Sequence, residues 1–301
     1  MQIKGINYDY MLFLSFRLKT FPPDHKVFTL SNLILHWMHK RAKIKYRNRN
    51  NIPNSFNGNK MPIFIFLAAH WYLSLFCQSF FLHRYGAHRM FLLSPFWQRF
   101  FYLMTLLTQG TSFLNPRAYA VMHRMHHAYS DTADDPHSPH FSSNIVQMMF
   151  KTYGIYTGLL KGTIDPGQFG YEIPEWKAVD RLGEHWLTRA VFALAYVAFY
   201  LVFAPSWWYF LLLPIHFAIG PIQGALVNWC GHKYGYVNHP ETNDRSRNTL
   251  VFDLFLLGEL FQNNHHKYPK SANFATRWFE FDPIYPVLKL LKALRVVRAA
   301  Y

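Results

Sequence analysis

The sequence predicts an all-α integral membrane protein, with three to four transmembrane helices and a cytoplasmic helical domain that carries a histidine-rich metal site. Two observations lead to this prediction. Long apolar segments hold little or no charge, and four histidine clusters stand at the ends of those segments or beside them. Hydrophobic residues make up 51% of the 301 residues while the overall hydropathy stays near neutral, so the apolar residues are concentrated in a few places.

Residues 1–60 differ from the rest of the chain. They are basic and rich in asparagine, with the turn-prone run NNIPNSFNGNK near their end, and the apolar stretch 28–38 is too short to span a bilayer. We expect a linker here, and we hypothesise that it is not part of the native protein, which would then begin at Met61. N-terminal sequencing of native protein that finds earlier residues would refute this hypothesis.

Three segments are long and apolar enough to be membrane spans. Residues 61–82 hold no charge, and a helix of that length at 1.5 Å per residue is roughly 33 Å long, which covers the hydrocarbon core. Residues 186–204 and 207–228 form a second pair around Pro205, with tryptophans at the junction where an aromatic belt would lie. We interpret this pair as a membrane hairpin.

Residues 91–114 are apolar but include Pro95, Arg99 and Gly110. A single crossing here would put the first and second histidine clusters on opposite sides of the membrane, where they could not share metals. We therefore expect an interfacial or re-entrant amphipathic helix. Two spans between the second and third clusters then bring all four to one face, whose many lysines and arginines indicate the cytoplasm.

Eight of the 17 histidines fall into the four clusters. In HRMHH the spacing i, i+3, i+4 places three imidazoles on one helix face. In HRYGAH the two histidines are five residues apart, about 140° around a regular helix, so we expect a helix end or a π-bulge there. Imidazole binds iron, zinc, copper and nickel, and eight of them indicate a dinuclear site. The candidate ligands are His83, His88, His123, His126, His127, His232, His265 and His266.

The chain resembles the membrane fatty acid desaturases, specifically the acyl-CoA (Δ9, stearoyl-type) branch, over residues 61–295. The motifs that carry the resemblance are HRYGAHRMF, HRMHHAYSDTADDPHSP, NWCGHKYG and GELFQNNHHKYP. The resemblance implies that the eight histidines ligate two iron ions and that Asn228 holds a metal-bound water. Gln262 stands where the last motif usually begins with histidine. An amide binds iron weakly or through water, so Gln262 is a candidate ninth ligand, or else a hydrogen-bond donor behind the ligands, at a position that affects the reaction outcome.

The resemblance also implies an enzyme that uses O2 and two electrons to insert a cis double bond into a saturated acyl chain, as acyl-CoA or acyl-lipid. A separate donor of ferredoxin, cytochrome b5 or rubredoxin type would supply the electrons, because the chain has no glycine-rich nucleotide loop. A fatty acyl hydroxylase or related di-iron oxygenase is the alternative that Gln262 keeps open. A non-catalytic membrane metal-binding protein is less favoured, because it would hold its metal residues inside the spans.

Other polar residues near the clusters have two interpretations each. The aspartates that follow the second cluster are Asp131, Asp134 and Asp135. We expect at least one of them to orient a ligand imidazole. Glu259 either holds a histidine or lies at the surface, and Arg84 and Arg124 either meet carrier phosphates or pair with Asp134 or Asp135. His70 and His216 lie inside spans, where we expect hydrogen-bonded residues of the helix bundle, with a functional role as the alternative.

The net charge of +15 does not indicate nucleic-acid binding. The basic run 40–49 stands without a recognition motif, so anionic membrane lipids are the expected partners. In residues 284–301, basic and apolar residues alternate at helical spacing. We expect a basic amphipathic helix on the membrane surface, or else one packed on the cytoplasmic domain.

Overall fold

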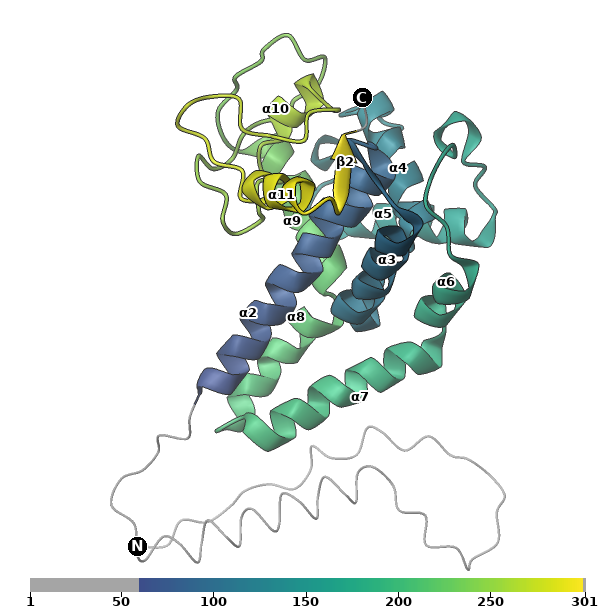
Figure 1. The fold of residues 1–301 in the computed structure, drawn as a ribbon, viewed down its shortest axis with the longest axis vertical. Coiled ribbons are helices and arrows are strands. Elements are labelled where there is room, and N and C mark those ends of the chain that lie inside the picture. The colour runs from purple at the N-terminus through teal and green to yellow at the C-terminus, as the bar shows by residue number, and fades with distance from the viewer. Residues whose placement is uncertain (1–59, 300–301) are drawn as a thin grey trace, which may run out of the picture. The chain divides into compact units, whose positions relative to one another are not determined.

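The computed structural model describes residues 60–299, which are mostly helical (Figure 1), and the prediction of an all-α chain is confirmed. The predictions for the basic N-terminal segment lie outside the described residues. In chain order the α-helices and strands are α2 Met61–Phe76, β1 Phe91–Leu93, α3 Pro95–Gln109, α4 Pro116–Tyr129, α5 Ile145–Lys161, α6 Lys177–Glu184, α7 Trp186–Phe203, α8 Leu213–Phe217, α9 Ile219–Lys233, α10 Gln262–Lys267, α11 Ile284–Ala293 and β2 Val297–Ala299.

Helix α2 continues without a break into a π-helix, Cys77–Ala87. Together they form an apolar helix of 27 residues, long enough to cross a membrane. Hydrogen bonds of a π-helix join residues five apart, and the amide of His88 donates to the carbonyl of His83 at 3.1 Å. The expected distortion at HRYGAH is therefore confirmed, and it brings His83 and His88 toward the same side of the helix.

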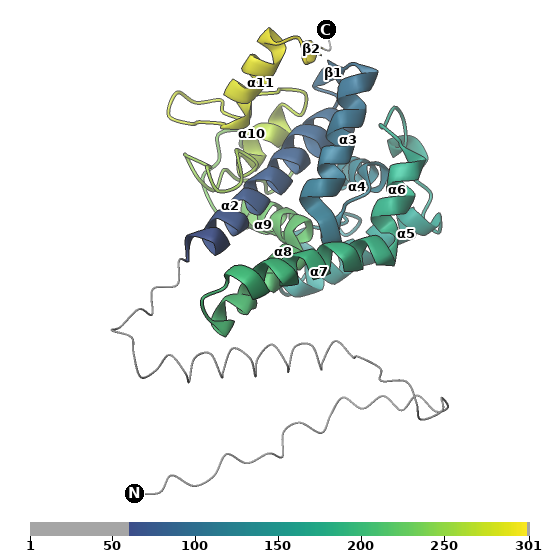
Figure 2. The same cartoon turned by 60° about the horizontal axis from the view of Figure 1, so that its bottom comes forward.

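The second predicted membrane segment is α7, whose 18 residues also have the length and composition of a span. The third is a broken pair: residues 207–217 and α9 meet at an angle of 71° and pass the same test only together. Within residues 60–299 there are thus two candidate spans, or three with the bent pair. In Figure 2 the long helix α7 passes in front of α8.

The segment 91–114 differs in detail from the single helix expected there. Its first three residues form β1, and α3 begins only after Ser94, whose side chain accepts a hydrogen bond from the Trp97 amide and so caps the helix. Helix α3 ends at Gly110, where φ is +50° and a Cβ would lie 1.9 Å from the Tyr196 hydroxyl. Glycine is therefore required at this turn. The exposed residues Phe96, Phe100, Leu103 and Leu107 lie along one face of α3.

Helices α4 and α5 complete the layer beside the π-helix. Asn115 caps α4 by accepting hydrogen bonds from the amides of Arg117 and Ala118, and Pro116 occupies the first turn. Asn144 caps α5, which ends at Gly162 in the left-handed conformation. Helix α4 packs extensively on the π-helix, so the second histidine cluster faces the first.

The C-terminal prediction of one amphipathic helix over residues 284–301 is wrong after Ala293. Helix α11 ends there, Arg295 has a positive φ of 59°, and the chain reverses into β2. Strand β2 pairs antiparallel with β1, with Phe91 opposite Ala299, and the two strands lie side by side in Figure 2. Val296 and Val297 are buried in the main core, and their β-branched side chains favour a strand over a further helical turn.

Candidate metal centre

The structure brings all eight predicted histidines together in two adjoining groups. The five-histidine group contains His83, His88, His123, His127 and His265. The three-histidine group contains His126, His232 and His266. Within each group one ring nitrogen of every member lies within 4.8 Å of those of the others. The groups touch through His127 and His266, whose ring centroids are 4.4 Å apart.

The spacing of the nitrogens matches that of ligands to a shared metal. Two nitrogens each about 2.1 Å from one metal and at right angles lie about 3 Å apart. The Nε2 atoms of His83 and His265 are 3.0 Å apart, as are those of His127 and His265. The Nε2 atoms of His123 and His127 are 3.1 Å apart, and those of His126 and His266 are 3.2 Å apart. The donor set therefore fits two metal ions that bind imidazole.

Four carboxylates hold the opposite nitrogen of four of these rings. Each pair joins the Nδ1 atom of the histidine to a carboxylate oxygen: His83–Glu259 at 2.6 Å, His126–Asp135 at 3.0 Å, His232–Asp131 at 2.9 Å and His266–Asp244 at 2.5 Å. Because Nδ1 donates its proton to the carboxylate, the Nε2 lone pair faces the group and is free to bind a metal. The expectation that an aspartate after the second cluster orients a ring is confirmed for Asp131 and Asp135, whereas Asp134 is exposed.

Burial keeps most of the imidazoles neutral, which is the form that binds metals. It lowers the pKa of five histidines well below the usual value, and the charges of neighbouring histidines lower it further; these are His88, His123, His126, His127 and His265. Burial alone would raise the pKa of Asp131, but the hydrogen bond and charge of His232 lower it overall. These five rings are therefore neutral near pH 7, and the pKa of Asp131 favours its ionised form.

Glu259 anchors one side of the centre and is buried. Besides His83 it accepts hydrogen bonds from Ser79 and from Arg84, whose other terminal nitrogen donates to Asp282 at 2.8 Å. The interpretation that Glu259 holds a histidine by a hydrogen bond is therefore confirmed. Both interpretations of Arg84 are wrong, because the guanidinium is fully buried between Glu259 and Asp282.

Arg124 likewise pairs with neither predicted aspartate. It donates to the backbone carbonyls of Ala87, Gly86, Phe169 and Tyr171 at 2.6–3.2 Å. The side chain therefore ties the end of the π-helix to the loop 169–171, and it is not available to meet a carrier phosphate.

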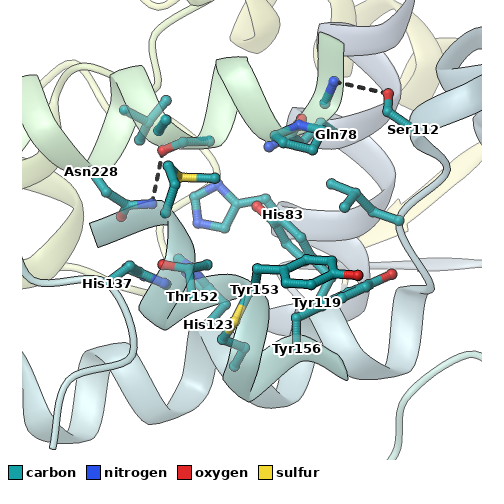
Figure 3. A pocket seen from close by; sticks show the side chains of 18 of the residues that line it. Gln78, His83, Ser112, Tyr119, His123, His137, Thr152, Tyr153, Tyr156 and Asn228 are labelled. Carbon is teal, nitrogen blue, oxygen red and sulfur yellow. Dashed lines mark hydrogen bonds between the residues drawn. The ribbon is translucent and has the colours of Figure 1, made fainter. Parts of the chain in front are cut away.

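An apolar cavity of about 170 Å³ lies beside the five-histidine group (Figure 3), and both predicted amides line it. The Asn228 side-chain amide donates to the carbonyl of Gly224 at 2.9 Å, and that of Gln262 donates to the carbonyl of Glu259 at 2.7 Å. The Gln262 side chain is buried and packs against Gly231. A Cβ added at Gly231 would lie 2.3 Å from the Cγ atom of Gln262. The geometry thus places both residues at the wall of the cavity and leaves their roles as predictions.

Sequence reasoning missed two residues of the site. Asp244 lies in the loop before α10 and reaches His266 only through the tertiary fold, so no local spacing indicates it. His137 lines the cavity and lies beside His126, with ring centroids 4.4 Å apart. Its place in the diagnostic run SDTADDPHSP was a signal that could have indicated it.

His70 and His216 lie far from the centre, in the apolar helices. Their Nδ1 atoms are 2.7 Å apart, and the Tyr200 hydroxyl is 2.9 Å from His216 Nε2. The expectation of hydrogen-bonded bundle residues is confirmed. This pair joins α2 to α8 inside the membrane segment, where an unpaired imidazole would be costly.

Apolar helices of membrane-spanning length that end beside two histidine groups with carboxylate partners indicate a helical membrane protein with a site that could hold metal. Residues 60–295 match the fatty acid desaturase family, and the chain belongs to that family. It is 32% identical over 225 residues to the sn-1 stearoyl-lipid 9-desaturase of Synechocystis sp., an alignment that covers 72% of this chain and 64% of that protein.

The alignments with two further relatives cover a larger share of each relative's length. The sn-1 stearoyl-lipid 9-desaturase of Anabaena variabilis is 27% identical over 250 residues, which is 81% of this chain and 84% of the relative. The hex-5-enoyl-[acyl-carrier protein] acetylenase of Moorena producens is 26% identical, with 75% and 73% covered. These matches confirm the predicted family and its Δ9 branch.

Proposed function

We propose that this protein is a Δ9-type membrane acyl desaturase, which inserts a cis double bond into a saturated acyl chain using O2 and two electrons at a di-iron centre. One observation carries the proposal: the eight histidines converge at the spacing of metal ligands beside an apolar cavity. The eight histidines would hold the two irons. When bound, iron supplies with O2 the oxidising power that an unactivated C–H bond demands and that no side chain possesses.

The chain's own residues position the substrate and keep water away from it. Met122, Ala225 and Val227 line the cavity with apolar surface, which suits a hydrocarbon chain. His83 and His123 reach the cavity wall, so a methylene pair in it would lie next to the five-histidine group (Figure 3). The carboxylates on Nδ1 fix the orientation of the rings, and Asn228 would hold a water at the metal.

The head group of the substrate is the finer part of the proposal. The motifs resemble acyl-CoA desaturases, while the names of the Synechocystis and Anabaena relatives specify stearoyl lipids and that of the Moorena relative specifies an acyl-carrier protein. We take acyl-CoA as the working substrate. Incubation of the purified protein with stearoyl-CoA, or with a distearoyl lipid in nanodiscs, separates these choices when a reductant and O2 are supplied.

The membrane arrangement follows from the candidate spans. Two or three candidate spans with the histidines near their ends support a centre on one side of the bilayer, and the basic residues there favour the cytoplasm. Electrons would arrive from a separate donor of ferredoxin, cytochrome b5 or rubredoxin type. A protease-protection assay on sealed vesicles, with an epitope inserted in the loop 238–246, tests the orientation.

Gln262 supports one alternative, a fatty acyl hydroxylase or related di-iron oxygenase. It faces the cavity at the position where the resemblance expects a histidine, so the coordination of one metal differs and with it the fate of the activated oxygen. A hydroxylated acyl product would favour this alternative.

The test is expression of residues 1–301 in a desaturase-deficient host, followed by mass spectrometry of the membrane fatty acids. The expected result is a new monounsaturated chain whose double bond follows carbon 9. The His126→Ala variant is the inactive control, because His126 belongs to the three-histidine group. A host profile that stays saturated despite iron-loaded protein and a supplied electron donor would contradict the proposal.

A further inference from the structure

The two histidine groups are unequal. Of the eight predicted histidines, five form one group and three form the other. The place where a fourth would come from α10 is taken by Gln262, whose amide nitrogen is committed to the carbonyl of Glu259. The three-histidine group is therefore short of one strong ligand on this side.

His137 stands next to this group, and its ring has no hydrogen-bond partner in the part of the chain that the structure describes. It is 4% exposed. Burial of a polar group without a partner is unfavourable, so a buried imidazole whose two nitrogens both lack a hydrogen-bond partner indicates a ligand. Its neighbour is His126, with ring centroids 4.4 Å apart, and ligand atoms of His137, His126 and Asp135 all lie within 4.8 Å of one another, a group that shares His126 with the three-histidine group.

The loop that carries His137 is built to fix this position. Asp135 accepts hydrogen bonds both from His126 Nδ1, at 3.0 Å, and from the backbone amide of His137, at 2.9 Å. One carboxylate thus positions two imidazoles at once. The His137 side chain points into the same cavity as Asn228 (Figure 3), and Gln262 lines that cavity as well.

We propose that His137 supplies the fourth imidazole of the metal bound by the three-histidine group, in the place left by Gln262. The proposal rests on the metal centre of the proposed function. It assigns a ligand from the loop after α4 instead of from α10, which leaves the cavity side of that metal framed by His137 and by the amides of Asn228 and Gln262.

The test counts iron in purified, iron-loaded full-length protein by mass spectrometry and records its Mössbauer spectrum. The wild-type chain is expected to hold two irons, and His137→Ala is expected to lose about one. His137→Ala with Gln262→His is expected to regain it, because a histidine then returns to α10. His185→Ala is the matched control, since His185 is exposed at the start of α7.

A second variant covers the case in which the alanine substitution unfolds the loop. His137→Gln keeps the side-chain length, and the spectrum of one of its two irons is expected to change while that of the other stays as in the wild type. Two irons with unchanged spectra in both His137 variants would overturn the proposal, and a raised KM for the acyl substrate would then place His137 on the substrate. These readouts need no turnover, so they stand even if no desaturated product is found.

Discussion

His83 and Glu259, 176 residues apart in the chain, share a buried hydrogen bond of 2.6 Å that joins the π-helix to the turn before α10. This hydrogen bond fixes the first histidine cluster relative to the segment that leads into the last one. Because Glu259 also pairs with Arg84, the same carboxylate fixes both a metal-facing ring and the buried cation beside it.

Glu259→Gln is expected to weaken iron binding about 10–100-fold, the usual effect of removing a carboxylate behind a metal-bound histidine. The amide still fits the space, but it no longer increases the basicity of His83 or neutralises Arg84. Competition with an iron chelator measures the change. Glu172→Gln is the control, because Glu172 is an exposed partner of Arg89, and equal iron affinities in the two variants would contradict this role.

Arg84→Met is expected to destabilise the protein by about 3–5 kcal/mol, since it leaves Glu259 and Asp282 buried without their cation. Arg89→Met removes a partly exposed pair with Glu172 and is expected to cost about 0–1 kcal/mol. Thermal unfolding of both variants in the same detergent compares them. A similar unfolding temperature for the two would show that the buried pair contributes no more than the surface one.

Acid is expected to destabilise the metal-free protein. Burial lowers the pKa of His123, His126 and His127 in the fold, whereas in the unfolded chain it is about 6.5. Below pH 6.5 the unfolded chain therefore binds more protons, and stability falls as the pH drops from there toward the lowered folded pKa values. Each such histidine contributes up to about 1.4 kcal/mol per pH unit.

Unfolding of the metal-free protein between pH 8 and pH 5 checks this expectation. The unfolding temperature is expected to stay level above about pH 6.5 and to fall below it. The His123→Gln variant is expected to show a shallower slope, because glutamine does not titrate. An unfolding temperature that rises on acidification would contradict the assignment of neutral rings.

The sequence predicted those parts of the site that depend on local spacing. The i, i+3, i+4 pattern places His123, His126 and His127 on one face of α4, and the five-residue gap indicates the π-helix. Composition alone locates α2 and α7, because long, predominantly apolar segments with little or no charge are typical of membrane spans.

The parts that sequence reasoning missed depend on where distant segments meet. Arg84 contacts Asp282 across 198 residues, and Asp244 reaches His266 from a loop without regular structure. Nor does the amphipathic pattern of residues 284–301 reveal that β1 offers Val297 a partner strand. Such side-chain contacts and strand pairings between distant segments leave no periodic pattern in the sequence, so they are seen only in the folded structure.

The apolar cavity leads to a last prediction, on Gly224. This residue of α9 lines the cavity, and a Cβ there would meet only the Gln78 amide nitrogen, at an ordinary contact of 3.5 Å. Gly224→Val is therefore expected to fold and to bind iron as the wild type does, while its methyl groups narrow the space for the acyl chain. Each displaced methylene in an apolar site changes discrimination by about 10–200-fold.

The expected result of Gly224→Val is a shift of the products toward shorter unsaturated chains, or loss of product from the longest ones. Gas chromatography of host fatty acids, beside an iron count, measures both. Gly154→Val on α5 is the matched control, because nothing lies within 4 Å of a Cβ there. If the two valine variants gave the same chain-length profile, this cavity would not hold the acyl chain, and the substrate path would have to lie elsewhere around the histidines.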